Sequence, residues 1–187
     1  MARTRPDSFL CSLAMINFVM HGDSQYSQEI PLGVGAIAAY IRHKGFPVRI
    51  TQCLADRGPE EIERAGLVEA DVYGFQLEMS NYPAVRAVAG IIRRRKPTAL
   101  LVLAAPYPSS LAAAILENER LFDCVVSGEG EETMLEIMEA AQRGEVDLAR
   151  VNGLVIRGAG DTVLHTPPRK PIRGLDSLPT PARGFIG

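Results

Sequence analysis

The chain alternates between short, almost continuous apolar runs and longer amphipathic stretches from Leu13 to about Arg143. The apolar runs are typical of β-strands that are covered on both faces, and they span 13–20, 46–54, 70–77, 99–105 and 122–128. The amphipathic stretches place apolar residues at helical spacing, and they span 30–45, 58–66, 82–95, 111–118 and 131–144. This alternation predicts an α/β fold with a five-stranded, parallel, doubly wound sheet of the flavodoxin-like (Rossmann-like) type.

Proline, glycine and asparagine refine the helix predictions. Pro31 is expected near the start of the first helix, where its missing N–H costs no hydrogen bond. Asn81 is expected to cap the helix over 82–95. Gly33 and Gly35 lie inside the first helical pattern, so we expect them to let that helix approach the sheet closely.

The last 40 or so residues change character. Two short β runs around the turn from Gly158 to Asp161 predict a hairpin over 149–166. The segment 167–187 contains five prolines and no clear periodicity, which is typical of an extended arm or an interdomain linker. The expected organisation is a tail (1–12), a main domain (13–148), the hairpin and the arm.

Charge and cysteine content narrow the class of protein. A net charge of −2 gives no general attraction to nucleic acid, and the one dense basic run, Arg93–Lys96, complements a helix dipole. The three cysteines, Cys11, Cys53 and Cys124, are too far apart for a metal knuckle and odd in number, which favours reduced thiols in the cytoplasm. No apolar run reaches the roughly 18 residues of a membrane span, and no signal peptide is visible, so we expect no membrane partner.

Ligands of an open parallel sheet bind beyond the carboxyl ends of its strands. The loop that follows the first strand contains His21 and Asp23, which are too few ligands for a closed metal site. Gly33 and Gly35 lack the third glycine of a dinucleotide fingerprint and the lysine of a phosphate loop. A classical nucleotide site is therefore disfavoured.

The turn Gly128-Glu129-Gly130-Glu131 indicates a ligand site more specifically than the loop after the first strand does. Its glycines permit close approach of a ligand to the backbone, and Glu129 can accept hydrogen bonds from that ligand. The alternative is that Glu131 and its neighbour are only acids of a first helical turn. No nucleophile–base pair or histidine triad is apparent, so the sequence predicts a protein that holds a reactive group rather than one that reacts itself.

Several segments in series resemble the cobalamin (B12)-binding domain of B12-dependent radical SAM enzymes. They are "PLGVGAIAAYIRHKGFPV", "DVYGFQ" with "SNYPA", "VVSGEGEETMLEIMEA", "VNGLVIR", "PPRKPI" and "LDSLPTPAR". Their order and spacing follow the family over residues 13–183.

The resemblance implies a corrin ring over the carboxyl edge of the sheet, with its benzimidazole tail inserted beside the sheet and detached from cobalt. The D-x-H-x-x-G motif that supplies a cobalt ligand in methionine synthase is missing, so the resemblance implies a lower face of cobalt that is open, bound to water, or approached by His21, Gln25 or Tyr26. The implied cofactor-binding residues are His21, Tyr26, Leu32, Gly33, Gln76, Leu77, Ser80, Asn81, Ala104, Ala105, Pro106, Tyr107, Gly128, Glu129, Gly130 and Glu131.

The chain also departs from the family. Gln76 replaces a small hydroxyl residue, and Ala104-Ala105 replaces a Gly-Gly pair, so added side-chain atoms could narrow the channel for the tail. The chain stops at Gly187, before the C-x-x-x-C-x-x-C motif of an iron–sulfur cluster, so no such cluster is expected in it.

Two functional hypotheses follow. In the first, the chain is a non-catalytic module that holds base-off cobalamin, for example methylcobalamin, for methyl transfer or related radical chemistry by a radical SAM partner docked through 167–187. In the second, it is a degenerate B12-binding fold that acts as an interaction or scaffold protein without a cofactor. A small-molecule enzyme using the same crevice is a weaker third reading.

Overall fold

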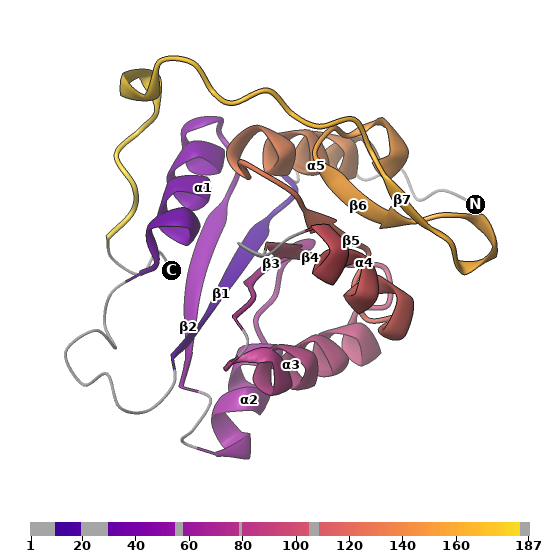
Figure 1. Ribbon diagram of the computed structural model, residues 1–187. Helices are drawn as coiled ribbons and strands as arrows, with labels where there is room; N and C mark the ends of the chain where they lie inside the picture. Colours follow the sequence, from indigo (N-terminus) through magenta and orange to yellow (C-terminus); the bar gives the residue numbers. More distant parts are fainter. Residues whose placement is uncertain (1–9, 20–29, 55–57, 79, 105–108, 184–187) are drawn as a thin grey trace.

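A seven-stranded sheet forms the centre of the computed structural model, which describes residues 10–19, 30–54, 58–78, 80–104 and 109–183. The strand order is β2-β1-β3-β4-β5-β6-β7 (Figure 1). The first five strands are parallel, and β6 and β7 join antiparallel at the β5 edge. The strands are β1 (Leu13–Val19), β2 (Val48–Leu54), β3 (Val72–Gln76), β4 (Leu100–Ala104), β5 (Cys124–Val126), β6 (Leu154–Arg157) and β7 (Val163–His165). The predicted flavodoxin-like sheet and the C-terminal hairpin are both confirmed.

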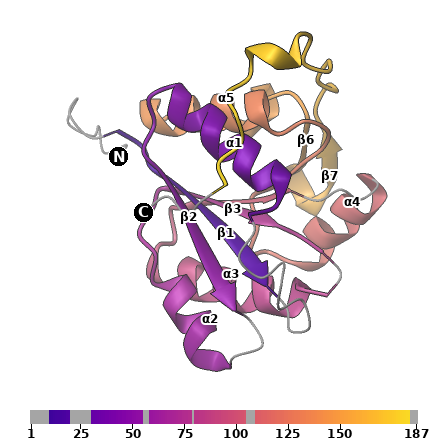
Figure 2. The ribbon, with the colours of Figure 1, turned by 90° about the vertical axis from the view of Figure 1, so that its left-hand side faces the viewer.

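Helices cover both faces of the sheet (Figures 1 and 2). On one face lie α1 (Leu32–His43) and α5 (Glu131–Arg143). On the other lie α2 (Pro59–Gly66), α3 (Tyr82–Arg95) and α4 (Ser109–Asn118). All five lie within two residues of the predicted bounds, because apolar periodicity and the flanking proline and glycine residues are local signals.

Two apolar cores result, one on each side of the sheet. On the α2/α3/α4 side, the Phe75 ring stacks with Phe18 at a centroid distance of 6.4 Å and meets Phe122 edge-on at 5.9 Å. On the α1/α5 side, Met15 packs with Ile37 and other aliphatic side chains. Because the central strands are buried on both faces, their sequences are nearly continuous apolar runs.

Asn81 precedes α3, but the prediction that its side chain caps the helix is wrong. Its backbone is already helical, with φ −98° and ψ −3°, whereas a capping residue adopts an extended conformation. The side chain instead accepts a hydrogen bond from Glu78 N at 2.9 Å and donates one to Gln76 O at 3.1 Å. Asn81 therefore braces the loop that leaves the carboxyl end of β3.

The expectation for Gly35 is also corrected, because this residue makes room for the C-terminal arm and not for the sheet. A Cβ at Gly35 would lie 2.5 Å from Ala182 O, and Ala182 N donates a hydrogen bond to Gly35 O at 3.1 Å. At Gly33, by contrast, no described atom lies within 4 Å of a Cβ. The two glycines of this helix thus have different surroundings.

The arm does not extend away from the domain. From β7 it runs back past α5, forms a short 3-10 turn at Leu175–Ser177 and reaches the first turns of α1 (Figures 1 and 2). Near its start, Gly153 N donates a hydrogen bond to Pro167 O at 2.9 Å. A segment that builds no core of its own is therefore held by contacts with the α1/α5 side.

The three thiols are buried, and burial should make them unreactive. Burial, reinforced by the Glu61 carboxylate, raises the pKa of Cys53 from 9.0 to about 11, and burial raises the pKa of Cys124 still further. At about pH 8, Ellman's reagent should react slowly with the native protein, because the thiolate is the nucleophile. Rapid reaction of all the thiols in denaturant is the control, and a fast stoichiometric reaction in the native state would contradict the prediction.

The same pKa shift links stability to pH. A thiol whose pKa is raised by folding is equally protonated in both states at low pH, but the unfolded state ionises first as the pH rises. Stability should therefore fall between pH 9.0 and about 11, which urea unfolding across that range can measure.

Candidate functional site

A crevice of about 400 Å³ lies at the carboxyl edge of the sheet. It opens between the N-terminal turns of α1 and α5, near the junction of β1 and β3. The helices that follow β1 and β3, α1 and α3, lie on opposite faces of the sheet, so the chain leaves a gap at this junction where ligands bind.

The floor of the crevice is a row of side chains from adjacent strands. Gln76 on β3 pairs with Ala104 on β4, and Ala104 pairs with Val126 on β5. All of these residues line the crevice, as does Met15 on β1. The floor is therefore apolar, except for the carboxamide of Gln76.

The walls are two helix N-termini without side-chain caps. α1 begins after Pro31 and has no acidic residue in its first turn, and Leu32 on that turn is 72% exposed. α5 begins after Gly130, followed by Glu131 at its first position. Free backbone N–H groups at such ends favour ligand groups that accept hydrogen bonds.

The Gly128–Glu131 turn lies at the rim of the crevice. Gly128 has φ +91°, a conformation that favours glycine, and no described atom lies within 4 Å of the position of a Cβ. The Glu129 carboxylate accepts a hydrogen bond of 2.6 Å from Ile172 N of the arm. Glu129 therefore lines the crevice and also binds the arm.

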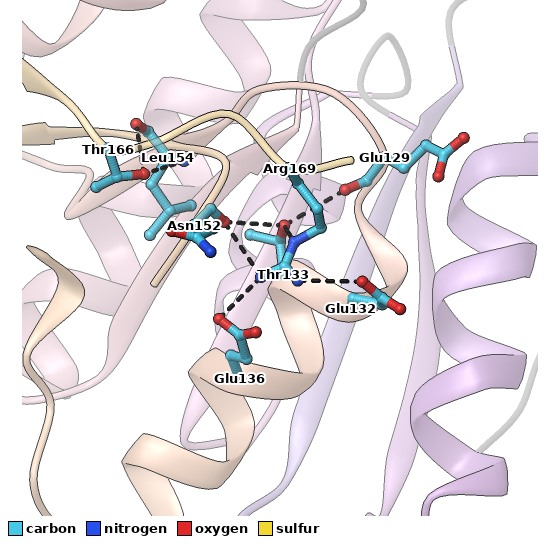
Figure 3. A network of polar contacts seen from close by, with 8 residues as sticks. All are labelled: Glu129, Glu132, Thr133, Glu136, Asn152, Leu154, Thr166 and Arg169. Atoms are coloured by element: carbon cyan, nitrogen blue, oxygen red, sulfur yellow. Dashed lines mark hydrogen bonds and ion pairs between the residues drawn. The ribbon is translucent and has the colours of Figure 1, made fainter. Parts of the chain in front are cut away.

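Arg169 anchors the arm beside the same turn (Figure 3). Its guanidinium donates to Thr133 Oγ1 at 3.0 Å and forms ion pairs with Glu132 at 3.1 Å and Glu136 at 2.8 Å. It also donates to Asn152 O at 3.4 Å, and its side chain is only 10% exposed. One cation thus joins the arm, the first turns of α5 and the segment before β6.

A larger hollow, of about 720 Å³, lies at the amino ends of β3 and β4. Ligands of parallel sheets bind at the carboxyl edge, and two cations of this hollow, Arg95 and Lys96, already pair with Glu69. No cluster of three metal-binding side chains occurs in the part of the chain that the structure describes. Within that part, no helix is both long and apolar enough to cross a membrane.

The family model of the B12 binding domain matches residues 22–138, which is more than half of the chain. The chain belongs to the B12-binding domain family. The resemblance noted in the sequence is thereby confirmed.

Relatives of this B12-binding domain are radical SAM proteins and other much longer chains. An anaerobic magnesium-protoporphyrin IX monomethyl ester cyclase from Rubrivivax gelatinosus is 25% identical over 83% of this chain and 29% of its own length. The cobalamin-dependent radical SAM methyltransferase TokK from Streptomyces tokunonensis is 26% identical over 62% of this chain and 17% of its own.

Among solved structures, the cobalamin-dependent S-adenosylmethionine radical enzyme OxsB, with aqua-cobalamin and S-adenosylmethionine bound, superposes with a TM-score of 0.75. It is 15% identical, and the match covers 92% of this chain and 24% of that of OxsB. The B12-binding domain described here therefore spans less than a third of the length of these relatives.

The structure brings together half of the residues that the sequence assigned to the cofactor. Leu77 is buried in the core on the opposite face, Ser80 is exposed in the β3–α3 turn, and Asn81 is used within that turn. His21, Tyr26, Ala105, Pro106 and Tyr107 lie outside the described residues, as does Gln25. The predicted residues that line the crevice are Leu32, Gly33, Gln76, Ala104, Gly128, Glu129, Gly130 and Glu131.

Sequence reasoning missed the apolar part of the crevice. Met15, Val34, Ile37 and Val126 also line it. Their apolar periodicity indicated only burial, and burial against a ligand resembles burial against protein in the sequence.

The residues of this B12-binding domain are compatible with a corrinoid. At the rim, Leu32 presents an exposed apolar surface beside the open space above Gly33. An apolar crevice with the carboxamide of Gln76 in its floor and two helix N-termini at its walls suits a large ligand that carries polar substituents.

Proposed function

We propose that this chain binds cobalamin in the base-off form and presents it to a radical SAM domain or protein for methyl transfer or related radical chemistry. The observation that supports the proposal most directly is the crevice at the β1/β3 junction of a B12-binding fold. When bound, the corrinoid supplies the cobalt-centred chemistry, and the chain binds and orients it.

The shape of the crevice rim supports this proposal. Leu32 offers apolar surface that no described side chain covers, and Gly33 leaves the space beside it open. A broad, mostly apolar ring can pack against such a surface, while the helix N-termini can donate hydrogen bonds to its amide substituents. The proposed binding residues are those of the crevice: Leu32, Gly33, Gln76, Ala104 and the Gly128–Glu131 turn.

The proposed partner follows from the relatives. TokK is described as a cobalamin-dependent radical SAM methyltransferase, and OxsB as a cobalamin-dependent S-adenosylmethionine radical enzyme. Each is several times longer than the match to this chain. We therefore propose that a radical SAM domain, in the same or another chain, approaches the carboxyl edge, with the arm (167–183) as the connection or docking segment.

Titration with hydroxocobalamin tests the proposal. The purified protein should retain the corrin absorption band through gel filtration, and its melting temperature should rise. Ligand at about 100 times its dissociation constant stabilises a protein by about 2.7 kcal/mol. A colourless protein with an unchanged melting temperature would refute cofactor binding and leave the scaffold hypothesis.

Two matched variants make this test specific. Gly33→Leu should fill the open space at the crevice and weaken binding by at least about tenfold, since overlap with a ligand costs more than about 1.4 kcal/mol. Gly90→Leu makes the same change in α3, where a Cβ meets only the Arg94 guanidinium at 3.6 Å. Both changes improve helix propensity, but only the first should affect cobalamin.

A further inference from the structure

The arm is attached to the α5 wall of the crevice at two points. Arg169 forms ion pairs with Glu132 and Glu136, both within the first turns of α5 (Figure 3). Ile172 N donates a hydrogen bond of 2.6 Å to the carboxylate of Glu129, which lines the crevice. A carboxylate has two oxygens, so Glu129 can bind the arm and a ligand at the same time.

The end of the arm is attached to the α1 wall. Ala182 N donates a hydrogen bond to Gly35 O at 3.1 Å, and the two backbones are so close that a Cβ at Gly35 would lie 2.5 Å from Ala182 O. Gly35 belongs to the first turn of α1, between Val34 and Ile37 of the crevice lining. One segment therefore joins both walls. It does so from outside, because neither Arg169 nor Ala182 is among the described residues that line the crevice.

The glycine turn before α5 needs this outer support. On its inner side the turn packs against α1, since a Cβ at Gly130 would lie 2.6 Å from Ile37 Cδ1. At Gly128, where φ is +91°, no described atom lies within 4 Å of the position of a Cβ. A glycine without such packing retains conformational freedom. The hydrogen bond from the arm to Glu129 restrains the turn between these two glycines.

We propose that Arg169 and Gly35 are positioning residues of the cofactor site, because through them the arm holds the α1 and α5 walls at the spacing that fits a corrinoid. This inference rests on the proposed function. A site whose walls sample several spacings binds its ligand with an affinity reduced by the fraction of molecules in the competent arrangement. Release of the arm therefore weakens binding although the lining of the crevice is unchanged.

Titration with hydroxocobalamin of the wild type, Arg169→Met and Gly35→Ala tests the inference. Each variant should bind cobalamin about fivefold more weakly, which is the low end of the usual coupling between two sites. Gly35→Ala improves helix propensity, but its methyl group displaces Ala182 from α1. The matched controls are Lys170→Met, on the exposed neighbour of Arg169, and Gly90→Ala in α3. Both should stay within about twofold of the wild-type affinity.

Three further measurements separate positioning from a general loss of stability. Ile92→Val destabilises the fold from the core on the opposite side of the sheet, and it should leave the affinity within about twofold. In Arg169→Met, saturating cobalamin should slow the exchange of the Ile172 amide, because coupling between ligand and arm is reciprocal. Without ligand, the Gly35 amide, which donates to Pro31 O at 2.9 Å, should exchange faster in Arg169→Met than in the wild type.

The outcomes distinguish this inference from the proposed function. Unchanged or tighter cobalamin binding by Arg169→Met or Gly35→Ala, or an equal loss in Ile92→Val, would overturn the inference while the proposed function stands. Unchanged exchange of the Gly35 amide in Arg169→Met would show that the arm does not couple the two walls, even in a protein that binds no cobalamin. Wild-type protein that retains no cobalamin would overturn the proposed function and, with it, the effect on affinity.

Discussion

Replacing Arg169 with methionine should release the arm from α5 and lower the free energy of unfolding by about 2 kcal/mol. The guanidinium lies between Glu132 and Glu136, and its side chain is 10% exposed. These two acids are one helical turn apart, so without the cation they repel each other. Their side chains are 42% and 40% exposed, so solvent offsets part of the loss and keeps it well below that of a fully buried pair.

Urea unfolding and hydrogen exchange measure the two effects separately. The amide of Ile172, which donates to Glu129 Oε2, should exchange faster in Arg169→Met, together with the neighbouring amides of the arm. Lys170→Met removes the adjacent, exposed cation and is the control, with an expected change within about 0.5 kcal/mol. An unchanged unfolding midpoint with a protected Ile172 amide would show that Arg169 does not hold the arm.

Truncating Phe75 to alanine should have the largest effect on stability, about 3–5 kcal/mol. The ring is fully buried at the centre of the sheet, in contact with Phe18 and Phe122. The substitution removes buried apolar surface and two aromatic contacts, and it leaves a cavity in the core. Since domains of this kind are stable by about 5–15 kcal/mol, much of the margin would be lost.

Chemical denaturation of Phe75→Ala, Phe75→Leu and Leu175→Ala forms the matched series. The leucine variant should lose less, about 1–2 kcal/mol, because it refills part of the cavity. Leu175 is 66% exposed, so its truncation should change stability by less than about 0.5 kcal/mol. If Phe75→Ala and Leu175→Ala had similar effects, the aromatic cluster would not support the sheet as described.

The location of the crevice could be predicted from the sequence, but only part of its lining could. The strand ends and helix starts identified Gln76, Ala104 and the Gly128–Glu131 turn, because parallel strands bring their carboxyl ends to one edge. Met15 and Val126 gave no signal, since an apolar residue in an apolar run does not reveal whether protein or a ligand covers it. Their place in the floor of the crevice depends on the register between neighbouring strands.

The contacts of the arm could not be predicted from the sequence either. Its prolines correctly predicted a segment without a core, but its contacts span long sequence separations. Arg169 reaches Glu132 across 37 residues, and Ile172 reaches Glu129 across 43. For the same reason, the sequence assigned the wrong neighbour to Gly35. A glycine in a helix indicates that another segment packs closely against it, but it does not indicate which segment.

The sequence by itself determined the order of strands and helices, the parallel sheet and the edge at which a ligand would bind, because each of these follows from local periodicity and from the chirality of βαβ connections. Only the tertiary structure decided which apolar side chains line the crevice and that the arm is held by Arg169 over α5. Those features arise from contacts between distant segments, whose free energies depend on burial and geometry that no local pattern encodes.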